Sequence, residues 1–171
     1  MALLAPPDPN WPLLADAEGA VWRKALSVEL IAIHHIGSTA VANLPAKPII
    51  DLLPVASTLA ALDRATPSLV AAGYEAMGPF GLHGRRYFRK SSPEGQRLIH
   101  AHAYAAGDPS IDRHLAFRDL LRRDPDIRAA YAEVKRAADA ASGGDINRYM
   151  DLKDSFIKTH EALALRRDPS A

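Results

Sequence analysis

Residues 34–51 read HHIGSTAVANLPAKPIID, and this stretch decides both the expected fold and the candidate site. Gly37 and Ser38 follow a short run of β-type residues and precede TAVANL, which is a plausible short helix. A strand, a Gly-Ser turn and a helix form an anion-binding geometry, because glycine lets the backbone approach a ligand and the free amides at the helix start point toward it. The Ser38 hydroxyl would add a further donor. The alternative is that Ser38 or Thr39 only caps that helix.

Asp51 lies in the apolar run KPIIDLLPV, which is too continuous for a half-exposed strand and predicts a central strand over 47–55 that ends near Pro54. A carboxylate there is costly to bury unless it binds a cation or accepts good hydrogen bonds. Beside a phosphate-binding turn it can hold Mg²⁺ that bridges phosphate oxygens, as nucleotide chemistry requires. The alternative is a structural salt bridge from Asp51 to Arg118 or Lys153.

The composition limits the classes of function. The chain has 171 residues, about one ordinary domain, so a single domain over 1–171 is expected. Its 21 Lys and Arg against 20 Asp and Glu give no general attraction to nucleic acid or anionic membrane, so any anion site must be local. The absence of cysteine excludes disulfides and thiolate metal sites and fits a reducing compartment, so a cytoplasmic location is expected. The N-terminal segment has no basic start and contains four prolines in MALLAPPDPNWPLLADAEG, which predicts neither a signal peptide nor a membrane span.

The pattern of apolar residues predicts an α+β fold, in which a small mixed sheet is flanked by helices and followed by about three C-terminal helices. The first part, roughly 14–105, has helices near 13–26 and 58–73, the second interrupted near Pro67. Its strands are expected at 29–37 and 47–55, with a further pair, RRYFRK and RLIHAHAY, across the turn SSPEGQ. In the last part, 108–167, Asp108 and Asp124 each precede a proline as helix N-caps, and GGDI at Gly143 begins the third helix.

Two cations fall on apolar helix faces. Arg118 lies between Ile111, Leu115 and Leu121, and Lys153 lies in the middle of a stripe made of Ile146, Tyr149, Met150, Phe156 and Ile157. A buried cation needs an anionic partner, so each either pairs with a carboxylate or borders a cleft that receives a negatively charged ligand. Lys47 can flank a strand start instead of binding a ligand, and Arg85 and Arg86 can be solvated charges at a strand edge.

The stretch HIGSTAVANLPAKPIIDLL resembles the signature of the GrpB family, also called UPF0157, which is a branch of the nucleotidyltransferase superfamily. The segments RRYFRK, HAHAY, RHLAFRDLLRRDP, YAEVK and YMDLKDSFI resemble later blocks of that family in the same order, so the similarity covers roughly residues 11–165. The resemblance implies a nucleotidyltransferase-like core with appended helices. It also implies a nucleoside triphosphate as substrate and a divalent metal, Mg²⁺ or a transition metal.

The reactive pattern of the superfamily is Gly-Ser followed by two carboxylates one residue apart, with a third on a later strand. Gly37 and Ser38 match the first element and Asp51 matches the first carboxylate, but Leu53 stands where the second would be. In place of the third are His100 and His102, which lie on the same face of an extended strand. With Asp51 they would form a mixed His/carboxylate site, which favours a transition metal over Mg²⁺. The alternative is that the two histidines form a hydrogen-bonded cleft wall.

Two functions are therefore expected as alternatives. As a nucleotide-dependent transferase or ligase, the protein would use one set of residues for catalysis and metal binding, Asp51, His100 and His102. It would hold the nucleotide phosphates with another set, Gly37, Ser38, Thr39, Lys47, Arg118 and Lys153. As a non-catalytic domain it would bind a nucleotide or another small phosphate ligand at the same cations, and Leu53 favours this alternative. Nucleic-acid binding is not expected, because Asp124 and Asp126 interrupt the modest basic cluster of Arg122, Arg123 and Arg128.

Overall fold

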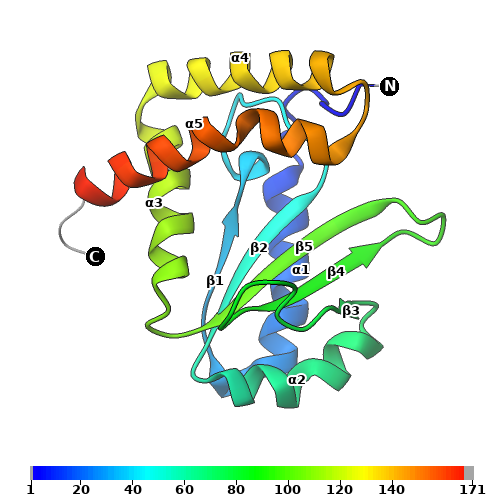
Figure 1. Ribbon diagram of the computed structural model, residues 1–171. Coiled ribbons are helices and arrows are strands. Elements are labelled where there is room, and N and C mark those ends of the chain that lie inside the picture. The colour runs from blue at the N-terminus through cyan, green and yellow to red at the C-terminus, as the bar shows by residue number, and fades with distance from the viewer. Residues whose placement is uncertain (1, 168–171) are drawn as a thin grey trace.

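The computed structural model describes residues 2–167 and has a five-stranded mixed sheet at its centre (Figure 1). The strand order is β1-β2-β5-β4-β3, and β2 runs parallel to β5 while the other neighbouring pairs are antiparallel. The strands are β1 Leu30–Ile36, β2 Ile50–Ala56, β3 Glu75–Ala76, β4 Arg86–Ser91 and β5 Arg97–Ala105. The helices are α1 Trp11–Leu26, α2 Leu59–Ala71, α3 Pro109–Arg123, α4 Pro125–Ser142 and α5 Ile146–Arg167. The expected α+β fold, with a small mixed sheet flanked by helices and three C-terminal helices, is confirmed.

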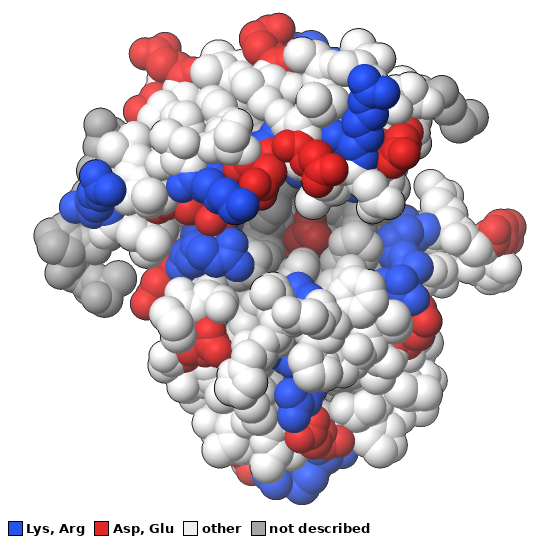
Figure 2. Space-filling view, in the orientation of Figure 1, with Lys and Arg blue, Asp and Glu red and all other residues white. Residues whose placement is uncertain are grey.

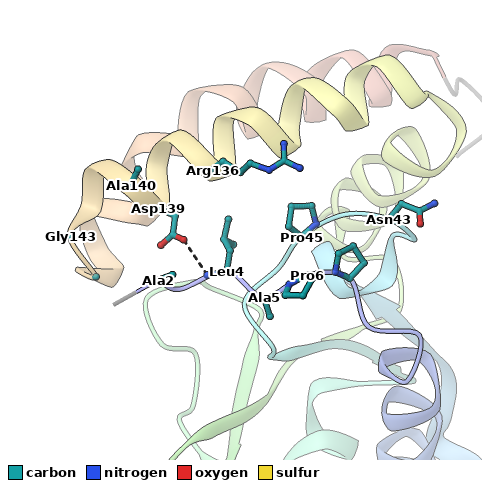
Figure 3. Close-up of a pocket in the computed structure, with 12 residues that line it drawn as sticks. Ala2, Leu4, Ala5, Pro6, Asn43, Pro45, Arg136, Asp139, Ala140 and Gly143 are labelled. Carbon is teal, nitrogen blue, oxygen red and sulfur yellow. Dashed lines mark hydrogen bonds between the residues drawn. The ribbon is translucent and has the colours of Figure 1, made fainter.

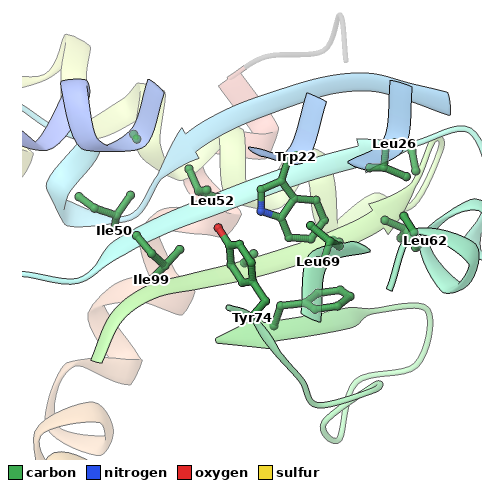
Figure 4. Close-up of a cluster of buried hydrophobic side chains, with 14 of the residues drawn as sticks. Trp22, Leu26, Ile50, Leu52, Leu62, Leu69, Tyr74 and Ile99 are labelled. Carbon is green, nitrogen blue, oxygen red and sulfur yellow. The ribbon is translucent and has the colours of Figure 1, made fainter. Parts of the chain in front are cut away.

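One face of the sheet is the main hydrophobic core. Because successive strand residues point to opposite faces, Ile50 and Leu52 of β2 lie on the same side as Ile99 of β5. These residues pack against α1 and α2, and Figure 4 shows Trp22 of α1 in the middle of the cluster. The Trp22 ring meets the Tyr74 ring edge-on, with the centroids 5.6 Å apart. This packing fixes β2 and β5 side by side and so fixes the residues on their opposite face.

The opposite face of the sheet is only partly covered. Leu53 and Tyr104 pack under Ile111 of α3, and all three belong to one buried cluster. Nearer the start of the same strands, Asp51 of β2 is paired in register with His100 of β5. They lie on this second face but outside the cluster under α3, so polar groups reach the surface of the sheet where the helical cover ends.

Helices α3 and α4 begin at the predicted caps, while α5 begins at Ile146, three residues after the predicted Gly143. The Asp108 carboxylate accepts a hydrogen bond from the Ser110 amide at 2.8 Å, and the Asp124 carboxylate accepts one from the Ile127 amide at 3.0 Å. The third helix is capped in the same way by Asp145. Among residues 2–167, no helix combines the length and the apolar character that crossing a membrane requires.

Two predictions about prolines are wrong. Pro54 lies inside β2, opposite Ile33 of β1, instead of ending the strand, because the neighbouring strands hold it in place and only its own missing amide is lost from the ladder. Helix α2 continues through Pro67 to Ala71 without a break. A proline there removes one backbone hydrogen bond, and the packing of Leu62 and Leu69 into the core maintains the helix on both sides of it.

Candidate functional site

A cleft of about 830 Å³ opens where the sheet meets helices α4 and α5. Figure 2 shows this hollow between the helical part and the sheet, with an acidic group deep inside it and basic groups at its edge. The residues that line it come from the segment 38–51, from the β3–β4 loop, β4, the β4–β5 turn and β5, and from α4 and α5: Ser38, Thr39, Ala46, Lys47, Ile49, Asp51, Phe80, Arg85, Tyr87, Arg89, Gly95, Arg97, His100, His102, Lys135, Ile146, Tyr149, Met150 and Lys153.

Asp51 and two histidines form the floor of the cleft. An Asp51 carboxylate oxygen lies 3.5 Å from His100 Nδ1 and 3.7 Å from His102 Nε2, and 28% of the Asp51 side chain remains exposed. Burial alone would raise the pKa of Asp51, but hydrogen bonding and charge from the two imidazoles outweigh it and hold the pKa well below its usual range. The Asp51 carboxylate is therefore ionised at neutral pH.

Gly37 packs directly against this carboxylate. Its φ is +70°, and a Cβ at this position would lie 2.5 Å from Asp51 Oδ2, so only glycine allows this approach. The helix predicted for TAVANL is wrong, because the turn contains only the three-residue 3₁₀ helix η2, Ser38–Ala40. Pro45 disfavours a longer helix, since it has no amide to donate and it biases Leu44 away from the helical region. A turn this short does not have the dipole of a full helix, so anion binding has to come from side-chain charges.

Three lysines supply such charges on the helical side of the cleft. Lys135 of α4 is only 2% exposed and Lys153 of α5 only 9%, while Lys47 is half-buried. The Nζ atoms of Lys47 and Lys153 lie 5.4 and 5.1 Å from the centroid of the Tyr149 ring. Lys135 donates a hydrogen bond to the Pro45 carbonyl. Within residues 2–167, none of the three ammonium groups has a carboxylate within 4.0 Å.

Burial lowers the pKa of all three lysines, and neighbouring lysines lower it further for Lys135 and Lys153. Burial, followed by the charges of Lys153 and Lys47, lowers the pKa of Lys135 to about 7, with Asp51 opposing the effect. Burial and the charge of Lys47 lower the pKa of Lys153 to about 8, and burial lowers the pKa of Lys47. A negatively charged ligand would reverse these shifts, because it favours the protonated amines.

Arginines line the strand side of the cleft. Arg89 donates two hydrogen bonds to Glu75, at 3.1 and 2.7 Å, and Arg97 lies 3.8 Å from the same carboxylate. Arg85 is buried, so it is not a solvated edge charge. Its guanidinium donates to backbone carbonyls instead of pairing with a carboxylate. The cleft is thus lined by three lysines and three arginines but by a single carboxylate, Asp51.

The structure brings most of the predicted site residues together and leaves one out. The predicted residues that line the cleft are Ser38, Thr39, Lys47, Asp51, His100, His102 and Lys153, and Gly37 lies against Asp51. Arg118 is absent from the cleft wall. Its guanidinium pairs with Asp119 at 2.8 Å and donates to the His35 carbonyl at 3.1 Å. Lys135 was missed, although its spacing from the buried residues Tyr131 and Ala138 is the same signal that singled out Lys153.

Comparison with known proteins identifies the family. The family model described as GrpB protein matches residues 2–162. The chain belongs to the GrpB family. The UPF0157 protein YqkA of Bacillus subtilis is 42% identical over 157 residues, which cover 92% of this chain and 45% of YqkA, so the chain spans less than half of that relative.

A crystal structure of the conserved GrpB protein of Enterococcus faecalis has the same fold. Its TM-score is 0.90 with 39% sequence identity, and the match covers 96% of this chain and 98% of that one. A nucleotidyltransferase-fold protein, Cid1 poly(U) polymerase, matches with a TM-score of 0.48 and 11% identity over 78% of this chain and 45% of that one. The Cid1 likeness is too loose to bear on the site.

The cleft does not have the paired-carboxylate metal site that the sequence resemblance implied. Leu53, which stands where the second carboxylate would be, is fully buried under α3 and cannot reach a metal in the cleft. Across the described residues, no group of three or more His, Asp and Glu side chains is placed so that it could hold a metal ion. Asp51 lies within 3.7 Å of both His100 and His102, and the predicted metal role of these three residues stays a prediction.

A second hollow, of about 700 Å³, lies between the N-terminal arm and α4 (Figure 3). Here the Asp139 carboxylate accepts hydrogen bonds from the Leu3 and Leu4 amides, at 2.8 and 3.3 Å. Arg136 pairs with Glu133 on the same helix. The charges of this hollow already have partners, so the GrpB chain has a stronger candidate site in the cleft over the sheet.

Proposed function

We propose that this GrpB protein binds a nucleoside triphosphate through its phosphate groups in the cleft between the sheet and helices α4 and α5. The observation that carries the proposal is the buried, carboxylate-free position of the Lys153 amine in an open cleft. Ser38, Thr39 and Lys47 line the same cleft and would supply further donors. Its volume of about 830 Å³ lies in the usual range for small-molecule sites, about 300–1,000 Å³.

Charge balance supports a polyanionic ligand. An ammonium group that leaves water without a counter-charge costs several kcal/mol of folding free energy. Lys135 and Lys153 are both in this position, and their nearest interactions are a backbone carbonyl and aromatic rings. A triphosphate would supply the missing counter-charge to both lysines at once. A neutral ligand would leave this electrostatic cost in place.

A second candidate function is a nucleotide-dependent transferase or ligase. It is favoured by the contact of the ionised Asp51 carboxylate with His100 and His102 on the cleft floor. Imidazole groups are common general acids and bases, and a carboxylate partner orients them and stabilises their protonated form. In this alternative, Asp51, His100 and His102 would be the catalytic residues beside a bound nucleotide.

A calorimetric titration with ATP and with inorganic tripolyphosphate tests the binding proposal. Lys153→Met should weaken the binding of both ligands at least tenfold, because a hydrogen bond to a charged group is worth about 1.5–3 kcal/mol. Lys158→Met is the matched control, because Lys158 is on the same helix but its side chain is 73% exposed and pairs with Asp154. Equal affinities of the two variants would contradict the placement of the phosphates beside Lys153.

Asp51→Asn separates the two candidate functions. Without a metal, removal of the one negative charge in the cleft should strengthen phosphate binding, because like charges repel. Release of pyrophosphate from each nucleoside triphosphate, with and without Mg²⁺, Mn²⁺ or Zn²⁺, then reports catalysis. Turnover by the wild type that Asp51→Asn abolishes supports the transferase or ligase. Tight binding without turnover under all these conditions supports the binding domain, and weaker metal-dependent binding in the variant supports a metal at Asp51.

A further inference from the structure

The loop that joins β3 to β4 presents a strained aromatic residue at the cleft. Phe80 lines the cleft, 54% of it is exposed, and its φ is +46°. A left-handed conformation is unfavourable for a residue with a side chain by about 1–2 kcal/mol. Strain of this kind persists only where the surrounding structure holds it, and it concentrates at functional sites.

A buried arginine holds Phe80 in place. Arg85 is 7% exposed, and its guanidinium donates to the Pro79 carbonyl at 3.2 Å and to the Phe80 carbonyl at 2.6 Å. The base of the loop is closed by backbone hydrogen bonds from Met77 to Tyr87 and from Tyr87 to Gly78, at 2.9 and 2.8 Å. The backbone hydrogen bonds at the base of the loop and the Arg85 guanidinium thus hold Phe80 in its strained conformation.

The Phe80 ring belongs to an aromatic cluster that begins on the cleft floor. It lies on the Tyr87 ring with the centroids 5.1 Å apart and the planes inclined by 27°. The Tyr87 ring in turn lies 5.2 Å from the His102 ring and 5.7 Å from the His100 ring. Phe80 contacts only the Tyr87 ring of this cluster, and 54% of Phe80 remains exposed beside the cleft.

Apolar side chains from α5 line the same cleft. Ile146 and Met150 are each about half exposed although they lie in a helix that also buries Tyr149. Large exposed apolar groups that gather at one cavity mark a ligand surface more often than scattered ones do. The cleft is therefore lined both by the lysines and by the apolar and aromatic side chains of Phe80, Ile146 and Met150.

We infer that Phe80 is a stacking platform for the aromatic ring of the ligand, in a cleft that Ile146 and Met150 also line. The inference rests on the proposed function, because the phosphates of the same ligand are placed at the lysines. The ligand class is a nucleotide whose base stacks on Phe80. Stacking accepts the π-face of any base, so this contact adds affinity without selecting one base.

The test compares ATP with tripolyphosphate, which has the same phosphate chain but no base. Phe80→Ala should weaken ATP binding about tenfold, since one base–aromatic stack typically contributes that much or more. Phe80→Ala should change tripolyphosphate binding less than twofold. Phe80→Tyr keeps an aromatic ring and should bind ATP as tightly as the wild type. Leu82→Ala is the matched control, because Leu82 is an exposed apolar residue of the same loop that does not line the cleft.

The possible results separate the two proposals. Phe80→Ala that leaves ATP binding unchanged, or that weakens ATP and tripolyphosphate equally, overturns the stacking inference while phosphate binding stands. A wild-type protein that binds neither compound overturns both proposals. Because Phe80 is exposed, the variant should fold, and an unchanged circular dichroism spectrum and melting temperature verify this for each variant.

Discussion

At the scale of single residues, Gly37 shows how closely the turn and the carboxylate depend on each other. Gly37→Ala would place a methyl group 2.5 Å from Asp51 Oδ2 at a φ of +70°. We expect this change to displace Asp51, to destabilise the fold by about 2 kcal/mol or more, and to alter phosphate affinity. Urea unfolding and calorimetry measure the two effects.

Gly107→Ala controls for backbone strain alone. Gly107 has a φ of +85°, but a Cβ there would meet nothing within 4 Å. Gly107→Ala should therefore destabilise the fold only by the cost of the positive φ, about 1 kcal/mol, and should leave the affinity for tripolyphosphate unchanged. If Gly37→Ala and Gly107→Ala were destabilised equally and bound tripolyphosphate with equal affinity, the close contact of Gly37 with Asp51 would not matter for binding.

The sequence predicted individual site residues where a charged side chain falls among apolar neighbours. Asp51 was conspicuous within an apolar strand, and Lys153 within an apolar helix stripe, and both line the cleft. Arg118 met the same criterion, yet it pairs with its neighbour Asp119 and with the His35 carbonyl. An inward-facing cation therefore indicates that a counter-charge is needed nearby. Only the three-dimensional neighbours decide whether the protein or a ligand supplies that counter-charge.

At the scale of elements, α5 carries both an apolar face and a buried amine whose position favours ligand binding over stability. The folded-state pKa of Lys153, about 8, is below the unfolded value of about 10.4, so the unfolded chain binds more protons between these two values. The contribution of Lys153 therefore makes the empty protein more stable as pH rises through this window, and its full cost is present at pH 7.

Lys153→Met should accordingly stabilise the empty protein at pH 7. We expect a gain of about 1–2 kcal/mol in the free energy of unfolding, shrinking toward pH 10, because methionine fills a similar volume without a charge. Urea unfolding at the two pH values measures it, with Lys158→Met as the exposed control. A loss of stability at pH 7 would contradict the view that the amine lacks a partner.

Elements were predictable where the determinants are local. The Asp-Pro caps of α3 and α4 act within four residues, and both helices begin where the sequence places them. The errors at Pro54 and Pro67 arise because packing overrides a local preference, whereas the helix expected for TAVANL is disfavoured locally by Pro45. The two-residue strand β3 was also missed, because its two residues are too short to produce a pattern and depend on pairing with β4.

At the scale of the whole molecule, the site exists only after β2, β5, α4 and α5 have packed together. Asp51, Lys135 and Lys153 are far apart in the sequence, and no local pattern specifies that they share one cleft. The sequence placed Asp51 and Lys153 in one predicted site but did not include Lys135. The loop of Phe80 and the role of Arg85 were not predicted, because a left-handed φ and two backbone hydrogen bonds leave no periodic trace in the sequence.

The central claim is that the phosphates of a nucleotide bind between the η2 turn and the lysines of the cleft. A crystal structure of the protein saturated with a non-hydrolysable ATP analogue tests it most directly. The expected result is phosphate oxygens within hydrogen-bond distance of the Lys47 and Lys153 ammonium groups, with the base on Phe80. Phosphates bound elsewhere on the molecule, with the cleft empty at saturation, would contradict the claim.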